Sequence, residues 1–85
     1  MEILFQASAF EDFIEWSEKD QKTFSKINKL IKEIILTPFE GTGNPEQLKY
    51  TQSGYWSRRI SLEHRLVYEV NDEIIIIISC KGHYT

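Results

Sequence analysis

Cationic side chains that could bind a phosphate are concentrated in one short stretch of this sequence. Residues 49–65 hold four basic residues and a single acidic residue, which gives the stretch a net charge of +3. The basic residues are Lys49, Arg58, Arg59 and Arg65. A guanidinium group binds phosphate through two parallel hydrogen bonds. Composition alone favours a phosphate site and solvated arginines at strand edges equally.

Two residues flanking this stretch could carry acid–base chemistry. Glu46 follows a proline, and His83 lies near the last residue. Carboxylates and imidazoles often act as general bases and acids, but a lone loop glutamate is usually solvated and a histidine near a chain end usually frays. Two histidines and the single Cys80 stand in no metal-ligand spacing. The sequence therefore predicts no disulfide, metal or cofactor.

Length and composition indicate one domain over residues 1–85. Hydrophobic residues make up 41% of the chain and charged residues 27%, an ordinary globular balance. No signal-peptide pattern opens the chain, and residues 74–78, the longest apolar run, are too few to span a bilayer. These features predict a cytoplasmic protein with no membrane contact. The net charge of −3 argues against strong nonspecific binding to nucleic acid.

A strand and a helix are expected to open the chain. Residues 2–6 have strand-forming composition. Ser8 and Glu11 have the spacing of a capping box, which predicts a helix over residues 9–17. The apolar side chains of this helix would form its core face: Phe10, Phe13 and Ile14.

A second helix is the clearest periodic signal in the sequence. Asp20 can cap its start, and Pro38 ends it. Apolar residues recur at helical spacing, with lysines between them, and should pack in the core: Phe24, Ile27, Leu30, Ile31, Ile34 and Ile35. Because few residues separate the two helices, they should form an antiparallel hairpin.

The second half of the chain predicts one ordered loop and four strands. The loop covers residues 38–47, with two prolines and two glycines, and loops of this length are often functional. The strands are expected over residues 48–51, 55–61, 65–70 and 74–80. The last, rich in isoleucine, should be the most buried and central strand.

The alternation of apolar residues sets the register of the middle strands. The core-facing positions are Trp56, Ile60, Leu66, Tyr68 and Val70. A hairpin that pairs residues of equal parity brings Arg59 and Arg65 together on the opposite face, with Tyr55 further along. The expected fold class is α+β: an N-terminal strand and a two-helix hairpin packed on one face of an antiparallel sheet, whose other face carries the arginines.

Five blocks of this sequence, in order and at matching spacing, resemble the YoeB family of bacterial toxins. They are TPFEGxG at 37–43, PExLK at 45–49, GxWSRRI at 54–60, EHRLVY at 63–68 and HY at 83–84. The resemblance covers essentially the whole chain. It implies a RelE-like fold, similar to that of small microbial ribonucleases.

The resemblance also implies a function. YoeB-type toxins belong to type II toxin–antitoxin pairs and cleave messenger RNA in the ribosomal A site without a metal. A YefM-type antitoxin inhibits them with a disordered tail, and the complex represses its own operon, so operator DNA is contacted only through that complex. Relatives suggest a homodimer, for which the lysine-striped second helix is one interface to consider.

Site residues follow from the same resemblance. Glu46 is implied as general base, Arg65 as phosphate stabiliser and His83 as general acid, with Tyr84 beside them. The implied substrate-binding residues are Lys49, Arg59 and Tyr55. In metal-free RNA cleavage the 2′-hydroxyl attacks the neighbouring phosphate, so a base, an acid and cations are all required.

Two other functions remain open. One is a non-catalytic module of the same fold that binds the ribosome or the antitoxin, and the other is a ribonuclease that needs no ribosome. The complete set of implied catalytic residues favours the enzyme over the first, and the modest local charge argues against the second. Four other residues are expected to be structural: His64, Cys80, Trp16 and Trp56.

Overall fold

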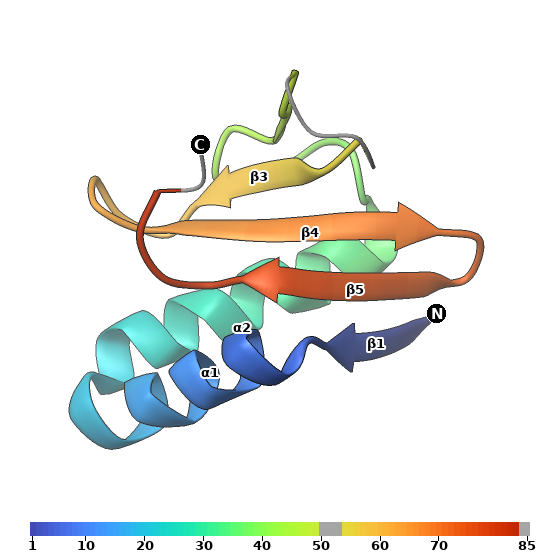
Figure 1. Cartoon of the computed structure of the whole chain (residues 1–85). Helices are drawn as coiled ribbons and strands as arrows, with labels where there is room; N and C mark the ends of the chain where they lie inside the picture. The colour runs from blue at the N-terminus through green and yellow to red at the C-terminus, as the bar shows by residue number, and fades with distance from the viewer. Residues whose placement is uncertain (50–53, 84–85) are drawn as a thin grey trace.

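Strand and helix periodicities divide this chain into two layers, a sheet and a helical hairpin. The computed structural model describes residues 1–49 and 54–83. The elements are β1 (Glu2–Phe5), α1 (Ala7–Lys19), α2 (Gln21–Leu36), β2 (Glu46–Gln47), β3 (Trp56–Arg59), β4 (Arg65–Asn71) and β5 (Ile74–Ser79). Both helices pack on one face of the sheet and leave the other uncovered by helix (Figure 1). The predicted α+β class is confirmed.

The sheet is mixed rather than wholly antiparallel. Its strand order is β1-β5-β4-β3-β2, and the pairs among β2, β3, β4 and β5 are antiparallel as predicted. β1 pairs in parallel with β5, which is possible because the connection between them is long and includes both helices. β4 therefore occupies the centre, and the prediction that the last strand is central was wrong by one position.

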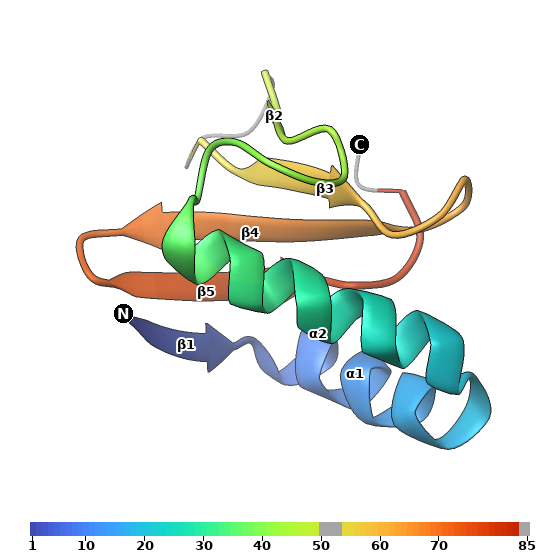
Figure 2. The ribbon, with the colours of Figure 1, turned by 180° about the vertical axis from the view of Figure 1, so that it is seen from behind.

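Helix α1 departs from its predicted start and face. It begins at Ala7 with Gln6 as N-cap and no side-chain cap, so the capping box predicted from Ser8 does not form. Ala9 is buried and Phe13 packs on the core, whereas Phe10 and Ile14 are 51% and 41% exposed. The prediction of the core face was therefore right only for Phe13. The helix continues from β1 and lies on the β1 side of the molecule (Figure 2).

Helix α2 follows its prediction closely. The Thr23 N–H donates to Asp20 Oδ1 over 3.1 Å and caps the helix, and Thr37, before Pro38, leaves helical geometry with φ −139°. Four stripe residues are buried against the sheet: Ile27, Leu30, Ile31 and Ile34. The remaining two, Phe24 and Ile35, are half-buried.

The edge strand after the loop was predicted too late in the sequence. β2 consists of Glu46 and Gln47, which pair with Ser57 and Trp56. Leu48 and Lys49 lie outside any strand, and the rest of the predicted strand, residues 50–51, lies outside the described residues. An edge strand needs no apolar side chains, since one of its sides faces solvent. The hydrophobic pattern of the sequence therefore could not predict the edge strand β2.

The register of the β3–β4 hairpin agrees with the prediction. Trp56 pairs with Tyr68, and Arg59 pairs with Arg65. All five predicted core-facing positions belong to the core or pack against it. The face away from the helices therefore presents the Arg59–Arg65 pair.

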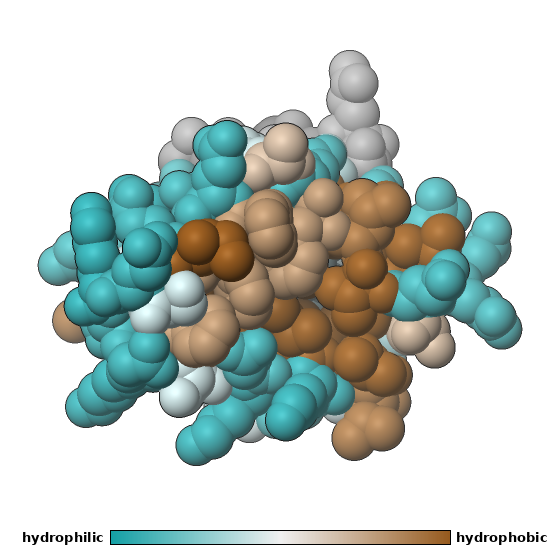
Figure 3. Space-filling model, turned by 90° about the horizontal axis from the view of Figure 1, so that it is seen from below, coloured by the Kyte–Doolittle hydropathy of each residue, from teal (hydrophilic) through white to brown (hydrophobic). Residues whose placement is uncertain are grey.

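Exposed apolar side chains gather along β1 and α1. Leu4, Phe10 and Ile14 are each about half exposed, and the brown surface in Figure 3 lies on this side of the molecule. None of the described helices is long and apolar enough to cross a membrane.

Candidate functional site

A cross-strand pair of arginines lies on the open face of the sheet. Arg59 of β3 stands directly opposite Arg65 of β4, a position in which Cβ atoms are about 5 Å apart. Arg59 is exposed, and Arg65 is held toward the hairpin turn because its Nη1 donates to the carbonyls of Ser61 and His64 over 2.9 and 3.3 Å. Neither forms an ion pair with any residue in the ranges 1–49 and 54–83. Like charges in such a pair repel, so the site favours an anion.

Glu46 lies beside this arginine pair. It is exposed and pairs with Ser57, which stands two residues before Arg59 on the same face of β3. Diagonal neighbours in a sheet are about 7–8 Å apart, within reach of long side chains. The β2–β3 register therefore makes Glu46 the diagonal neighbour of Arg59 on the same face of the sheet.

His83 is held at the same hairpin by backbone contacts. The Arg65 N–H donates to the Gly82 carbonyl over 3.0 Å, and His83 Nε2 lies 3.0 Å from the carbonyl of Leu62. Since a carbonyl only accepts, Nε2 carries the proton in this contact. The chain after β5 thus turns back past the start of β4, as Figure 1 shows, and brings His83 to the turn that joins the two arginines.

His64 positions this segment. Its Nδ1 accepts a hydrogen bond from the Gly82 N–H over 2.8 Å, and its ring meets Trp16 edge to face at 4.9 Å. The structural role predicted for His64 is confirmed, and its hydrogen-bond partner is the segment that carries His83. No local sequence pattern indicates this contact, which joins positions 18 residues apart.

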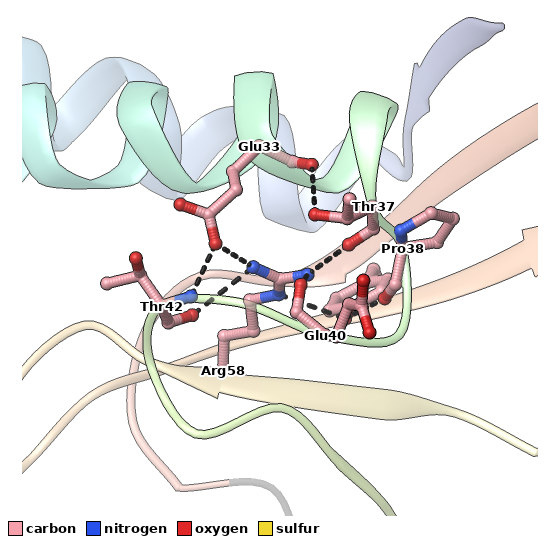
Figure 4. Close-up of polar contacts among 7 residues, drawn as sticks. Glu33, Thr37, Pro38, Glu40, Thr42 and Arg58 are labelled. Atoms are coloured by element: carbon pink, nitrogen blue, oxygen red, sulfur yellow. Dashed lines mark hydrogen bonds and ion pairs between the residues drawn. The ribbon is translucent and has the colours of Figure 1, made fainter.

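The third arginine faces the other way and has no access to a ligand. Arg58 is 0% exposed, because it has the parity of the core-facing positions. Its Nη1 donates to Glu33 Oε1 over 2.7 Å and to the Thr42 carbonyl over 3.2 Å. Its Nη2 donates to the carbonyls of Thr37 and Glu40 over 2.6 and 2.9 Å. The loop after α2 therefore wraps around a buried guanidinium (Figure 4), and Arg58 does not belong to a phosphate site.

Two other side chains complete this network. Arg58 Nε donates to the Tyr68 hydroxyl over 3.2 Å, and that hydroxyl donates to the Pro38 carbonyl over 2.6 Å. Burial raises the pKa of Tyr68, which keeps the hydroxyl protonated. The hydrogen bond from the Thr42 N–H, together with Arg58, lowers the pKa of Glu33, which keeps this carboxylate charged.

The wrapped loop is attached directly to the arginine pair. Gly43, with φ +88°, accepts a hydrogen bond from the Arg59 N–H over 2.7 Å. The chain then reaches Glu46 after only two more residues. The Arg58 network, which the sequence did not reveal, thus fixes the loop that places Glu46 beside Arg59.

For the remaining predicted site residues, the structure gives solvent exposure rather than a place beside the arginines. Lys49 is exposed, Tyr55 is half-buried, and Tyr84 lies outside the described residues. Cys80 is buried, and burial raises the pKa of its thiol to about 12, which confirms its structural role. In residues 1–49 and 54–83 no group of three histidine, cysteine or acidic side chains could hold a metal.

Comparisons with known proteins converge on one family. Residues 5–84 match the model of the YoeB-like toxin of bacterial type II toxin–antitoxin systems. Toxin YoeB of Escherichia coli K12 is 48% identical over 84 residues, covering 99% of this chain and all of the relative. The toxin in a YoeB–YefM complex from Staphylococcus aureus superposes with a TM-score of 0.90 at 48% identity, covering 99% of this chain and 98% of that one. A YoeB dimer from the same organism gives 0.92 at 49% identity, with the same coverage.

Proposed function

The chain belongs to the YoeB-like toxins of bacterial type II toxin–antitoxin systems, and we propose that it is a ribosome-dependent endoribonuclease that cleaves messenger RNA in the A site. One observation carries the proposal. Arg59 and Arg65 are cross-strand neighbours on the helix-free face of the sheet, Glu46 is the diagonal neighbour of Arg59, and His83 contacts the turn that joins the two strands. The action is assigned to the cytoplasm, where the ribosomes are.

The order of groups along the hairpin suits in-line cleavage. Glu46 pairs with a residue two positions before Arg59, whereas His83 contacts Leu62, three positions after it. A phosphate held by the arginines therefore lies between the base and the acid. Glu46 takes the proton of the 2′-hydroxyl, the 2′-oxygen attacks phosphorus, and the bond to the 5′-oxygen breaks. His83 protonates that leaving oxygen, and no metal is required.

The cations act on the charge that develops in this reaction. Negative charge builds on the phosphoryl oxygens in the transition state, and guanidinium groups fixed beforehand stabilise it most. The Arg65 guanidinium is fixed by two carbonyls of the turn, whereas at Arg59 it is the backbone that is held, by the hydrogen bond to Gly43. Lys49, Tyr55 and Tyr84 are assigned to RNA binding and support of the site.

The test is primer extension on a defined messenger RNA with purified ribosomes. The parent should make discrete cuts within A-site codons, and Glu46→Gln and His83→Gln should each lower the cutting rate by about 10²-fold or more. Glu40→Gln is the matched control, since Glu40 is an exposed carboxylate in the same loop. Blocked translation without cuts would favour a binding inhibitor, and cuts without ribosomes would favour a free-standing ribonuclease.

The partners of this protein are proposed from its relatives. A YefM-type antitoxin should bind and inhibit it, and two copies should form a homodimer, as the Staphylococcus aureus toxins do with YefM and with themselves. The helix-free face, where Arg59 and Arg65 form no ion pair with residues 1–49 or 54–83, would suit an acidic antitoxin segment. Contact with operator DNA would occur only through the antitoxin complex.

A further inference from the structure

The segment that carries His83 leaves the sheet before it reaches the candidate site. β5 ends at Ser79, and His83 stands four positions further along the chain and is exposed. Between them, Gly82 has no side chain, and even a Cβ at its position would meet nothing within 4 Å in the part of the chain that the structure describes. The place of His83 therefore depends on a few polar contacts of residues 80–82.

Two side chains from different parts of the fold hold this segment. Trp16 of α1 donates its indole Nε1–H to the Cys80 carbonyl over 2.9 Å. His64, directly before β4, accepts a hydrogen bond at Nδ1 from the Gly82 N–H over 2.8 Å. The two rings meet edge to face with their centroids 4.9 Å apart, an arrangement that aromatic rings favour. Trp16 and His64 are together called the clamp below.

The contact at His64 requires one particular atom. A backbone N–H only donates, so Nδ1 accepts with its lone pair, and the ring proton in this contact is on Nε2. A leucine, similar in size, would fill the space but leave the Gly82 N–H without this acceptor. Many side chains could supply the packing, whereas the hydrogen bond needs an acceptor at the position of Nδ1.

Gly82 is held at both of its backbone polar groups. Its N–H donates to the His64 side chain, and its carbonyl accepts from the Arg65 N–H over 3.0 Å. The peptide groups on either side of Gly82 are therefore tied to the start of β4, the strand that carries Arg65. His83 follows directly, with its Nε2 3.0 Å from the Leu62 carbonyl. The clamp thus fixes the backbone from which the imidazole extends, relative to the arginine pair.

We propose that Trp16 and His64 are positioning residues for the catalytic acid, which hold residues 80–82 so that the His83 imidazole reaches the leaving oxygen. This inference rests on the proposed function and adds two residues to the support of its site. Neither residue is assigned a contact with RNA. Misplacing a reacting group by about 1 Å can lower a rate about 10²-fold, so loss of the clamp should affect the chemical step rather than binding.

The test compares two substitutions of His64 in the ribosome-dependent cleavage assay, under conditions where circular dichroism shows each protein to be folded. His64→Leu removes the acceptor and should lower kcat at least about tenfold, with KM for ribosomes within about twofold of the parent. His64→Asn places an amide oxygen near the position of Nδ1 and should restore kcat to within about threefold of the parent.

Trp16 has a test of its own. Trp16→Phe keeps an aromatic ring against His64 but removes the donor to the Cys80 carbonyl. It should lower kcat by about threefold or more, since a single neutral hydrogen bond has a net worth of about that size. KM for ribosomes should stay at the parental value.

A second readout needs no ribosomes. Amide hydrogen exchange at Gly82, followed by NMR, reports whether its N–H is hydrogen-bonded. Exchange in His64→Leu should be at least about tenfold faster than in the parent, and His64→Asn should retain the protection.

The matched control is Ile35→Ala. Ile35 is half-buried on α2 and packs against the core, but its side chain offers no hydrogen bond to residues 80–82. This variant should lower the free energy of unfolding and leave both kcat and the exchange rate at Gly82 at parental values. An equal loss of kcat in Ile35→Ala and His64→Leu would show a general effect of stability and overturn the proposal.

Three other results would also overturn the proposal. One is a parental kcat in folded His64→Leu. Another is an equal loss of kcat in His64→Leu and His64→Asn, which would assign His64 to packing alone. The third is a raised KM with kcat unchanged, which would assign His64 to the binding of the ribosome.

Failure of this inference and failure of the proposed function are distinguishable. If the parent cuts no messenger RNA, the proposed function is wrong, and the catalytic role of the clamp falls with it whatever the exchange rate at Gly82. If the parent cuts and His83→Gln stops the cutting, but His64→Leu cuts as the parent does, only this inference is wrong.

Discussion

The burial of Arg58 is the strongest constraint on a single residue in this molecule. A guanidinium removed from water is costly unless its N–H groups are satisfied. Five hydrogen bonds from Arg58 match its five N–H donors, and they end on Glu33, Tyr68 and three loop carbonyls. The adjacent Arg59 has the same chemistry and is exposed. Strand parity alone gives these neighbours opposite roles.

This difference predicts unequal effects of one conservative change. Arg58→Lys keeps the charge but leaves several loop carbonyls without a donor, at about 1–3 kcal/mol for each buried orphan. The free energy of unfolding should fall by about 3 kcal/mol or more, as read from urea unfolding. Arg59→Lys is the matched control and should change it by about 0.5 kcal/mol or less. Equal effects of the two substitutions would contradict the buried role of Arg58.

A second residue-scale prediction concerns Cys80. Its thiol is buried, and burial raises its pKa to about 12, so the reactive thiolate is nearly absent at neutral pH. Native protein at pH 8 should react with a thiol reagent such as dithiobis-nitrobenzoate far more slowly than a free cysteine. Protein unfolded in urea should react at the rate of a free cysteine. Rapid labelling of the native state would show that this site opens readily.

The sequence predicted correctly the helices and strands in which buried apolar residues recur at regular spacing. The stripe of α2 and the alternation in β3 and β4 each recur often enough to fix both element and register. That register is also what paired Arg59 with Arg65. The start of α1 and the two-residue β2 were missed because neither has such a repeat. Helix α1 begins at Ala7 with no side-chain cap, and β2 is made by pairing with β3.

The candidate site shows the same division. The resemblance supplied Glu46, Arg65 and His83, and the hairpin register supplied the Arg59–Arg65 contact. What no local pattern predicted is the support for these groups. His64 contacts a residue 18 positions away, and Arg58 contacts the Thr37 carbonyl 21 positions away. Such long-range contacts of polar groups with backbone leave no periodic signal.

The wrapped loop leads to a prediction about two glycines. Both Gly43 and Gly82 have positive φ, at +88° and +75°. A Cβ at position 43 would lie 3.1 Å from the Arg59 carbonyl oxygen and 3.2 Å from its nitrogen, whereas one at position 82 meets nothing within 4 Å. Gly43→Ala should therefore lower the free energy of unfolding by about 2–3 kcal/mol, and Gly82→Ala by about 1 kcal/mol.

Activity should separate these variants further. The rigid contact of Gly43 is with the backbone of Arg59, so Gly43→Ala should also slow A-site cleavage under conditions where the protein stays folded. Urea unfolding and primer extension on the two variants provide the measurements. A Gly43→Ala protein as stable and as active as Gly82→Ala would refute a fixed loop.

For the whole molecule, ion pairs and caps set the pH range of stability. Hydrogen bonds from Thr23 lower the pKa of Asp20, and those from Thr42 lower the pKa of Glu33. A lowered carboxyl pKa contributes stability that is present above the unfolded value, about 4, and is lost as pH falls through the folded value. A hydrogen bond to Glu15 raises the pKa of Lys81, so its contribution is lost as pH rises above about 10.4.

The urea midpoint should therefore be level between about pH 5 and pH 8 and fall on both sides. The alkaline decline begins first with Cys80, because the unfolded chain ionises this thiol while the folded chain raises its pKa to about 12. Glu33→Gln should lower the urea midpoint throughout the level pH range, because Arg58 loses its buried counter-charge. It should also make the fall of the midpoint at acid pH shallower. Urea titrations at intervals of one pH unit, with both proteins, provide the measurement. An undiminished midpoint from pH 7 to pH 3 would contradict the lowered carboxyl pKa values.

The loop around Arg58 also orders events in time. The loop carbonyls accept hydrogen bonds from Arg58, which follows them in the sequence by 16 to 21 residues. The loop can therefore take its folded conformation only after β3 has joined the sheet. Contacts that close longer loops form more slowly, because chain entropy must be lost first. Glu46 is thus fixed late, after the helices have formed. Under the proposed function, a newly made chain would be largely folded before it could cleave messenger RNA.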